Sequence, residues 1–179
     1  MLFRSLAGLA DVIAVDPLPS RCAMAEGRGA TEVWATGADE AAKRLDERTK
    51  GRGADIVFDI TGNPSVFHAA QRMLAKRGRL GLIGDAAKPS LQTMTQEIIG
   101  KSARIVAAHG SMPPQTGNAY FRWGKREQTA FFFEMIRKGR IDVDNLESHV
   151  IAPERAPETY ADILVRRGMY MGVFVDWNG

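Results

Sequence analysis

Four stretches of the sequence end an apolar run on a residue that can contact a ligand. Asp16 closes "VIAVDP", and Thr61 and Gly62 follow the run in "DITGNP". Gly84 closes the run in "LIGD", and His109 closes the run in "AAHG". In open parallel sheets, ligands bind in the crevice beyond the carboxyl ends of the strands. We therefore expect these residues to lie around one ligand-binding edge.

The carboxylate of Asp16 can accept hydrogen bonds from both hydroxyls of an adenosine ribose. It would also repel a 2'-phosphate, which favours NAD over NADP. Arg21 follows five residues later, on an expected helix, within reach of the same ribose or of the adenine edge. The residues leave open a simpler interpretation, in which Asp16 is a helix cap or turn acid and Arg21 is solvent-exposed.

The two glycines permit close approach of the backbone to a ligand, and Gly84 would let the chain pass beneath a nicotinamide ring. Asn63 can cap the helix that follows it. His109 can pack against the cofactor or carry a proton near neutral pH, or it can be no more than a polar strand end.

The sequence predicts no metal site. His68 and His149 have no Cys, Asp or Glu partner at metal-ligand spacing. The single cysteine, Cys22, excludes an internal disulfide and a Cys-rich zinc site, and we expect it to be a small apolar residue on a helix. No catalytic residue is assigned.

Composition narrows the class of protein. The 179 residues are 45% hydrophobic and 25% charged, which predicts one main core, and no apolar run reaches the roughly 18 residues of a membrane span. The net charge of +3 is spread among acids, as in "AAKRLDERTKGR", so nucleic-acid binding is not expected. "MLFRSLAGLA" lacks the apolar core and cleavage site of a signal peptide, which predicts a cytoplasmic protein.

Strands and helices are predicted to alternate along the first two thirds of the chain. This alternation indicates a parallel sheet covered by helices on both faces. The predicted strands are residues 11–16, 31–35, 54–60, 79–84 and 103–108, and the predicted helices are residues 20–29, 38–51 and 64–78.

The pattern changes after His109. A Pro-, Gly- and aromatic-rich loop over 111–124 precedes a helix over 126–139, and a strand ending in "HVIA", a helix from near Pro153 and a strand over 170–177 complete the chain. We therefore predict two parts, a cofactor-binding domain over 1–139 and a C-terminal segment over 140–179.

Three stretches together resemble a known family. They are "VIAVDPLPSRCAMAEGRGATEVW", "GADIVFDITGNPSVFHAAQRMLAKRGRLGLIG" and "KGRIDVDNLESHVIAPERAPETYADI". Their order and spacing are similar to those of the zinc-type medium-chain alcohol dehydrogenases, including sorbitol- and threonine-dehydrogenase-like members. The resemblance implies an α/β fold, namely a Rossmann-like doubly wound parallel sheet that lacks its first strand and Gly-rich turn. The C-terminal segment would return to a catalytic domain that is missing from the chain.

The resemblance also implies roles for individual residues. Asp16 would be the ribose acid, with Pro17 and Arg21 near the adenosine. The remaining cofactor contacts would be Ile60, Thr61 and Gly62 in the wall of the cleft, Ile83 and Gly84 beside the nicotinamide, and Ala107 and His109 beyond it. The family's zinc ligands belong to the N-terminal domain, so this chain is not expected to bind zinc.

The resemblance implies the cofactor-binding portion of an NAD-dependent alcohol or polyol dehydrogenase that oxidises a secondary alcohol. A truncated product, an expressed fragment or a chain whose other part lies elsewhere would be inactive alone. The alternative is a non-catalytic nucleotide-binding or dimerisation remnant, a homo-oligomer formed through the edge of the strand over 103–108. A methyltransferase also places an acid after its second strand, although "DITGNP" and the tail fit that class poorly.

Overall fold

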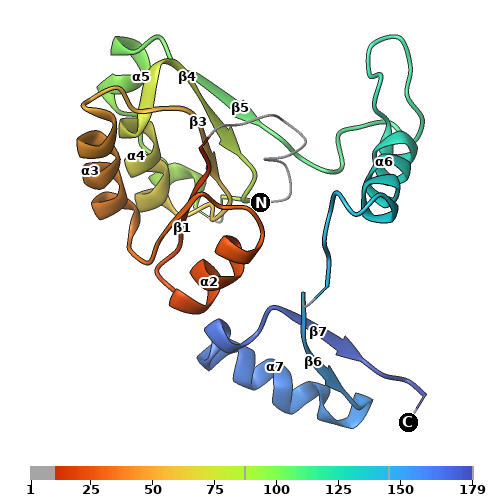
Figure 1. Ribbon diagram of the computed structural model, residues 1–179. Coiled ribbons are helices and arrows are strands. Elements are labelled where there is room, and N and C mark those ends of the chain that lie inside the picture. Colours follow the sequence, from red (N-terminus) through yellow and green to blue (C-terminus); the bar gives the residue numbers. More distant parts are fainter. Residues whose placement is uncertain (1–10, 87, 145, 179) are drawn as a thin grey trace. The chain divides into compact units, whose positions relative to one another are not determined.

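The computed structural model describes residues 11–86, 88–144 and 146–178. Its strands pair in three sheets (Figure 1). The sheets are β1 (Ile13–Val15) with β2 (Glu32–Trp34), then β3 (Ala54–Asp59), β4 (Leu74–Leu82) and β5 (Arg104–Ala107), then β6 (Glu147–Ile151) with β7 (Gly172–Val175). The α-helices are α2 (Pro19–Gly27), α3 (Ala38–Thr49), α4 (Pro64–Arg72), α5 (Gln96–Gly100), α6 (Lys125–Arg137) and α7 (Ala156–Val165).

The chain divides into two compact units. One comprises residues 15–17 and 34–126 and contains the β3–β4–β5 sheet with α3, α4 and α5. The other comprises the described residues of 1–14, 18–33 and 127–179 and contains the β6–β7 sheet with α2 and α7. The predicted boundary near residue 139 remains a prediction.

The β3–β4–β5 sheet is parallel, and its strands end together. Asp59 of β3 pairs with Leu82 of β4, and Leu82 pairs with Ala107 of β5. The segments that follow these three residues therefore leave the same edge of the sheet.

One face of this sheet packs against α4, which in turn contacts α3 and α5 (Figure 1). A fully buried glutamine of α4, Gln71, bonds the loop that precedes α5. Its side-chain amide donates to the Thr93 carbonyl at 2.9 Å and accepts from the Thr95 N–H at 2.8 Å. The buried cluster at this face consists of Phe67, Ala70, Leu74 and Leu80, with Val57, Leu82, Ile98, Ala103 and Ile105 packed against it.

The opposite face is exposed in the described part of the chain. Ile56, Phe58 and Val106 point away from the buried cluster, and Phe58 is 62% exposed. The ring of Phe58 lies over Gly81, where an added Cβ would stand 2.7 Å from the Phe58 Cδ1 atom. The alternation along β3 is that of a strand with one buried face.

The helix predicted over 64–78 is too long, because strand pairing ends it early. α4 ends at Arg72, and Leu74 already pairs with Ala54 as the first residue of β4. The register then shifts before Ile56 pairs with Arg79, so residues 75–78 form an irregularity within β4. The Arg77 N–H donates to the Lys101 carbonyl at 2.7 Å within this irregular stretch. The sequence pattern up to Gly78 predicts a helix, but the pairing of Leu74 with Ala54 ends the helix at Arg72.

The strand predicted over 79–84 begins earlier than predicted, at Leu74, and ends at Leu82. The remaining predicted elements match observed ones to within a few residues at each end. No helix of the described segments has both the length and the apolar character needed to cross a membrane.

Candidate functional site at the carboxyl ends of β3, β4 and β5

The sheet brings most of the predicted site residues to one edge. Because Asp59, Leu82 and Ala107 are in register, the residues just beyond them are neighbours at this edge. These residues are Ile60, Thr61 and Gly62 after β3, Ile83 and Gly84 after β4, and Ala107 itself with His109 at the end of β5.

A buried carboxylate organises the loop after β3. Asp59 is 3% exposed, and its Oδ1 atom accepts hydrogen bonds from the Thr61 N–H and the Thr61 hydroxyl, both at 2.8 Å, and from the Gly62 N–H at 3.3 Å. The Asp59 carbonyl accepts from the N–H groups of Ile83 and Gly84 at 2.9 and 3.1 Å. One residue therefore fixes the loops of two neighbouring strands.

The two loops touch through their glycines. Gly62 has a φ of +66°, and a Cβ there would lie 2.0 Å from the Asp85 carbonyl oxygen. A Cβ on Gly84 would lie 2.6 Å from the Gly62 nitrogen. The predicted close approach at these glycines is thus between the two loops. It does not show an approach to a ligand.

Two apolar side chains project from this edge. Ile60 is 71% exposed and Ile83 is 48% exposed. They follow the paired residues Asp59 and Leu82, and residues in register on neighbouring strands point to the same side of a sheet. The edge therefore offers an apolar surface formed by Ile60 and Ile83.

Asn63 and Gln92 complete the loop after β3. The side-chain oxygen of Asn63, Oδ1, accepts from the Ser65 N–H at 3.0 Å, which confirms the predicted cap of α4. The Gln92 side chain, 30 positions further along the chain, donates to the Gly62 carbonyl at 2.9 Å.

Sequence reasoning missed Asp59 and Gln92. The spacing of Asp59, Thr61 and Gly62 is that of an aspartate that turns the chain by bonding the backbone two residues on, and this signal could have identified Asp59. No local signal marks Gln92, because its partner lies in a distant part of the sequence.

His109 is exposed and interacts within its own loop. Its Nδ1 atom lies 2.6 Å from the Ser111 hydroxyl and accepts from the Ser111 N–H at 3.3 Å. An acceptor Nδ1 places the proton of the neutral ring on Nε2. Ala107 is also exposed.

The residues predicted to contact the adenosine follow β1 or lie on α2. Asp16 follows β1, is half-buried, and its N–H donates to the Trp34 carbonyl at 3.3 Å. Pro17 is exposed beside it. Arg21 lies on α2, which belongs to the other compact unit.

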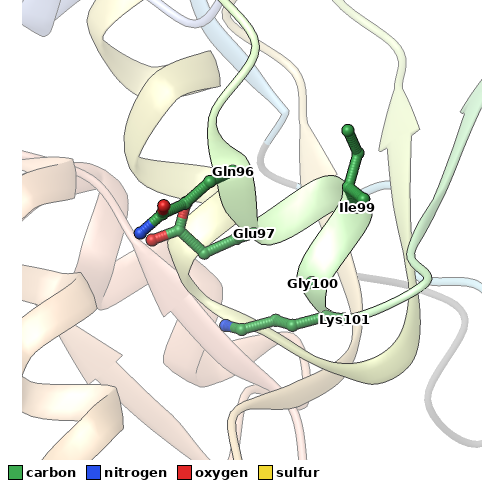
Figure 2. A pocket seen from close by; sticks show the side chains of 5 residues that line it. All are labelled: Gln96, Glu97, Ile99, Gly100 and Lys101. Carbon is green, nitrogen blue, oxygen red and sulfur yellow. The ribbon is translucent and has the colours of Figure 1, made fainter.

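A surface depression of about 470 Å³ lies on α5 and is separate from this edge (Figure 2). In Figure 2 the side chains of Gln96, Glu97 and Lys101 extend to one side of α5, and that of Ile99 extends in a different direction; all four residues line the depression. The Thr95 side chain, which precedes α5, and the N–H of Glu97 itself hold the pKa of the Glu97 carboxyl below its ordinary value. The Lys101 ammonium donates to the Arg72 carbonyl at 2.7 Å, so this cation supports the end of α4.

The described residues contain no group of three or more His, Cys, Asp or Glu side chains arranged to hold a metal ion.

A parallel sheet with a helix packed on one face and tightly packed glycine loops at its carboxyl edge defines a Rossmann-like α/β domain of the cofactor-binding type. The sequence had predicted helices on both faces, whereas the described residues cover only one face of the β3–β4–β5 sheet. The family model for zinc-binding dehydrogenases matches residues 3–124. The chain belongs to this family, as the sequence resemblance implied.

Known proteins similar to this chain agree with that assignment. D-guloside 3-dehydrogenase of Escherichia coli K12 is 26% identical over 156 residues, which are 86% of this chain and 44% of that protein. An alcohol dehydrogenase from E. coli CFT073, solved with NADH, is 17% identical with a TM-score of 0.76 over 98% of this chain and 47% of that one. A protein from Sinorhizobium meliloti 1021, solved with NADP, is 18% identical with a TM-score of 0.68 over 88% of this chain and 43% of that one. The chain spans less than half the length of these proteins.

Proposed function

We propose that this chain is the NAD-binding portion of a zinc-type dehydrogenase that oxidises a secondary alcohol of the polyol or sugar class. The observation that carries the proposal is the registered carboxyl edge of β3, β4 and β5, with its apolar residues Ile60 and Ile83. The substrate class rests on the similarity to D-guloside 3-dehydrogenase, whose name specifies a sugar derivative.

Asp16 is the residue proposed to select NAD. It stands directly after β1, half-buried, where a carboxylate can accept from two ribose hydroxyls and would repel a 2'-phosphate. Similar proteins have been solved with NADH and with NADP, and we assign the choice between the two cofactors in this chain to the Asp16 carboxylate.

At the other end, Ile60 and Ile83 would hold the nicotinamide ring, and Ala107 and His109 would lie beyond it. When bound, the cofactor supplies the hydride acceptor. This chain's own contribution is to bind and orient the ring and to exclude water from one of its faces. We assign no zinc ligand or proton relay to the described residues, and so we propose that the chain alone does not turn over an alcohol.

Cofactor titration tests the proposal. The chain should bind NADH more tightly than NADPH, as followed by nicotinamide fluorescence. Asp16→Ala should abolish that preference, because the same-sign charge next to the 2'-phosphate is removed. Asp11→Ala is the matched control, since it removes a carboxylate from the opposite end of the same apolar run. Equal affinity for the two cofactors in the unmodified chain, or alcohol-dependent NADH formation by the chain alone, would contradict the proposal.

A second candidate function is self-association, and the position of β5 favours it. β5 is the last strand of its sheet, so among the described strands one of its edges pairs with nothing, and Val106 is 52% exposed. An unpaired strand edge can accept a second copy of itself across a twofold axis. Sedimentation should then show a dimer, and Val106→Lys should shift it to monomer.

A further inference from the structure

In the loops after β3 and β4, several backbone N–H groups already donate hydrogen bonds to residues at the end of β3 or in the loop after it. N–H groups that gather ahead of a helix are the usual means by which a protein binds a phosphate. Here they donate to Asp59, by its side chain or its carbonyl, or to the Thr61 hydroxyl. The N–H groups accounted for in this way are those of Thr61, Gly62, Asn63, Ile83 and Gly84.

The first turn of α4 offers few further donors. Pro64 has no N–H, the Ser65 N–H donates to the side chain of Asn63, and the Phe67 N–H already makes the intrahelical bond to the Asn63 carbonyl at 3.0 Å. An anion at this helix end would have to compete with Asn63 for the Ser65 N–H, and only the Val66 N–H of this turn stands outside these bonds. The edge therefore suits an uncharged group better than an anion.

A side chain from outside the two loops fixes their position. Gln92 donates to the Gly62 carbonyl, and Gly62 in turn fits against Asp85 so closely that no side chain can be accommodated. We call this arrangement the loop clasp: Asp59, residues 60–63, residues 83–86 and Gln92.

We propose that Asp59 and Gln92 are positioning residues, and that the loop clasp they form presents Ile60 and Ile83 as a preformed apolar seat for the nicotinamide ring, with no role for this edge in holding the pyrophosphate. This inference rests on the proposed function, because it names which end of the cofactor the edge receives.

The physical reason is preorganisation. Ordering two loops at the moment of binding would reduce the affinity for the ring, whereas loops already held by hydrogen bonds avoid that loss. Loss of a clasp bond should weaken binding of a ligand that carries the ring and leave binding of one that lacks it unchanged.

The test compares NADH with ADP-ribose, which is the same ligand without the nicotinamide. Gln92→Ala removes the hydrogen bond to the Gly62 carbonyl. Asp59→Ala removes the side-chain acceptor of the Thr61 N–H, whereas Asp59→Asn retains an acceptor oxygen at the same place. Gln96→Ala is the matched control, since Gln96 is an exposed glutamine on nearby α5. Affinities come from fluorescence and calorimetry, and amide hydrogen exchange of residues 60–63 reports on the clasp without any ligand.

Gln92→Ala should weaken NADH binding by roughly three- to tenfold, the effect of one hydrogen bond, with ADP-ribose affinity unchanged. Exchange of residues 60–63 should accelerate in Gln92→Ala and in Asp59→Ala, remain close to that of the unmodified chain in Asp59→Asn, and not change in Gln96→Ala. Equal weakening of both ligands, or unchanged exchange and NADH affinity in Gln92→Ala, would overturn the proposal.

The comparison of NADH with ADP-ribose distinguishes failure of the proposed nicotinamide site from failure of the proposed NAD-binding function. If the unmodified chain binds ADP-ribose as tightly as NADH, the ring seat is refuted while the adenosine half of the proposed function stands. If it binds neither ligand, the proposed function fails and the assignment of the ring fails with it.

Discussion

Two aspartates organise two different regions of this molecule, and they do so with different kinds of partner. Asp59 is almost fully buried and accepts hydrogen bonds from uncharged donors of its own loop. Asp162, on α7, has a side chain that is 22% exposed, and it accepts from the Arg166 guanidinium at 2.7 Å and from the Tyr170 hydroxyl.

The partners determine what each carboxylate can do. Asp59 fixes the backbone of residues that follow a strand end, so its effect is a defined loop at the candidate site. Asp162 joins α7 to the segment before β7, where the Tyr170 ring also stacks on His149 with centroids 4.4 Å apart. We infer that the first region serves binding and that the second serves the local fold.

The largest expected effect is a loss of unfolding free energy in Gly62→Ala, and Gly139→Ala shows how much of that loss comes from the backbone conformation alone. Gly62 and Gly139 have nearly the same φ, +66° and +63°, but only Gly62 has neighbours within reach of an added Cβ. Gly139→Ala should cost about 1 kcal/mol of unfolding free energy for the left-handed conformation. Gly62→Ala should cost about 3 kcal/mol or more, because the Cβ meets the Asp85 carbonyl. Equal losses in urea unfolding would show that the two loops are not locked together.

The next largest effect is the loss of unfolding free energy when the carboxylate of Asp59 or of Asp162 is removed. Asp59→Ala leaves the N–H groups of Thr61 and Gly62 without their acceptor, which should cost about 1 to 3 kcal/mol of unfolding free energy. Asp162→Ala should cost less, since its partners remain accessible to water. Thermal unfolding of the two variants at neutral pH measures the difference. A larger loss in Asp162→Ala would reverse the comparison.

The smallest effect is the pH dependence of stability that Asp162 contributes. The Arg166 guanidinium, and then the Tyr170 hydroxyl, hold the pKa of this carboxyl below its ordinary value of 3.8. A lowered folded-state pKa contributes stability that is present above the unfolded-state value and is lost as the pH falls through the folded-state value.

Asp162→Asn should therefore flatten the loss of thermal stability between about pH 5 and pH 2. Glu154→Gln, the same change of carboxylate to amide in the short helix Pro153–Arg155, is the control and should retain the slope of the unmodified chain. An unchanged slope in Asp162→Asn would show that the bonds to Arg166 and Tyr170 do not affect acid stability.

Much of the fold could be predicted because its signals are local. Apolar runs such as "ADIVFDI" predicted the strands, and the Asn-Pro pair at 63–64 predicted the start of α4. The end of α4 could not be predicted, because it depends on the pairing of Leu74 with Ala54, a residue on another strand.

The candidate site divides in the same way. The sequence marked Ile60, Thr61, Gly62, Ile83 and Gly84 as strand-end residues, and parallel pairing brings them to one edge. The roles of the two glycines were not predictable, since each makes room for the backbone of the other loop. The choice of cofactor at Asp16 remains a prediction.

The sequence by itself determined the order of the elements, because hydrophobic periodicity and turn residues are encoded within short segments. It also determined the family, through its resemblance to known members. Only the tertiary structure decided which groups at the strand ends remain available for a ligand. A backbone N–H is encoded at every residue except proline. Whether it is already bonded depends on acceptors such as Asp59. Whether a backbone carbonyl is already bonded depends on donors such as Gln92, which the fold brings to Gly62 from a distant part of the sequence.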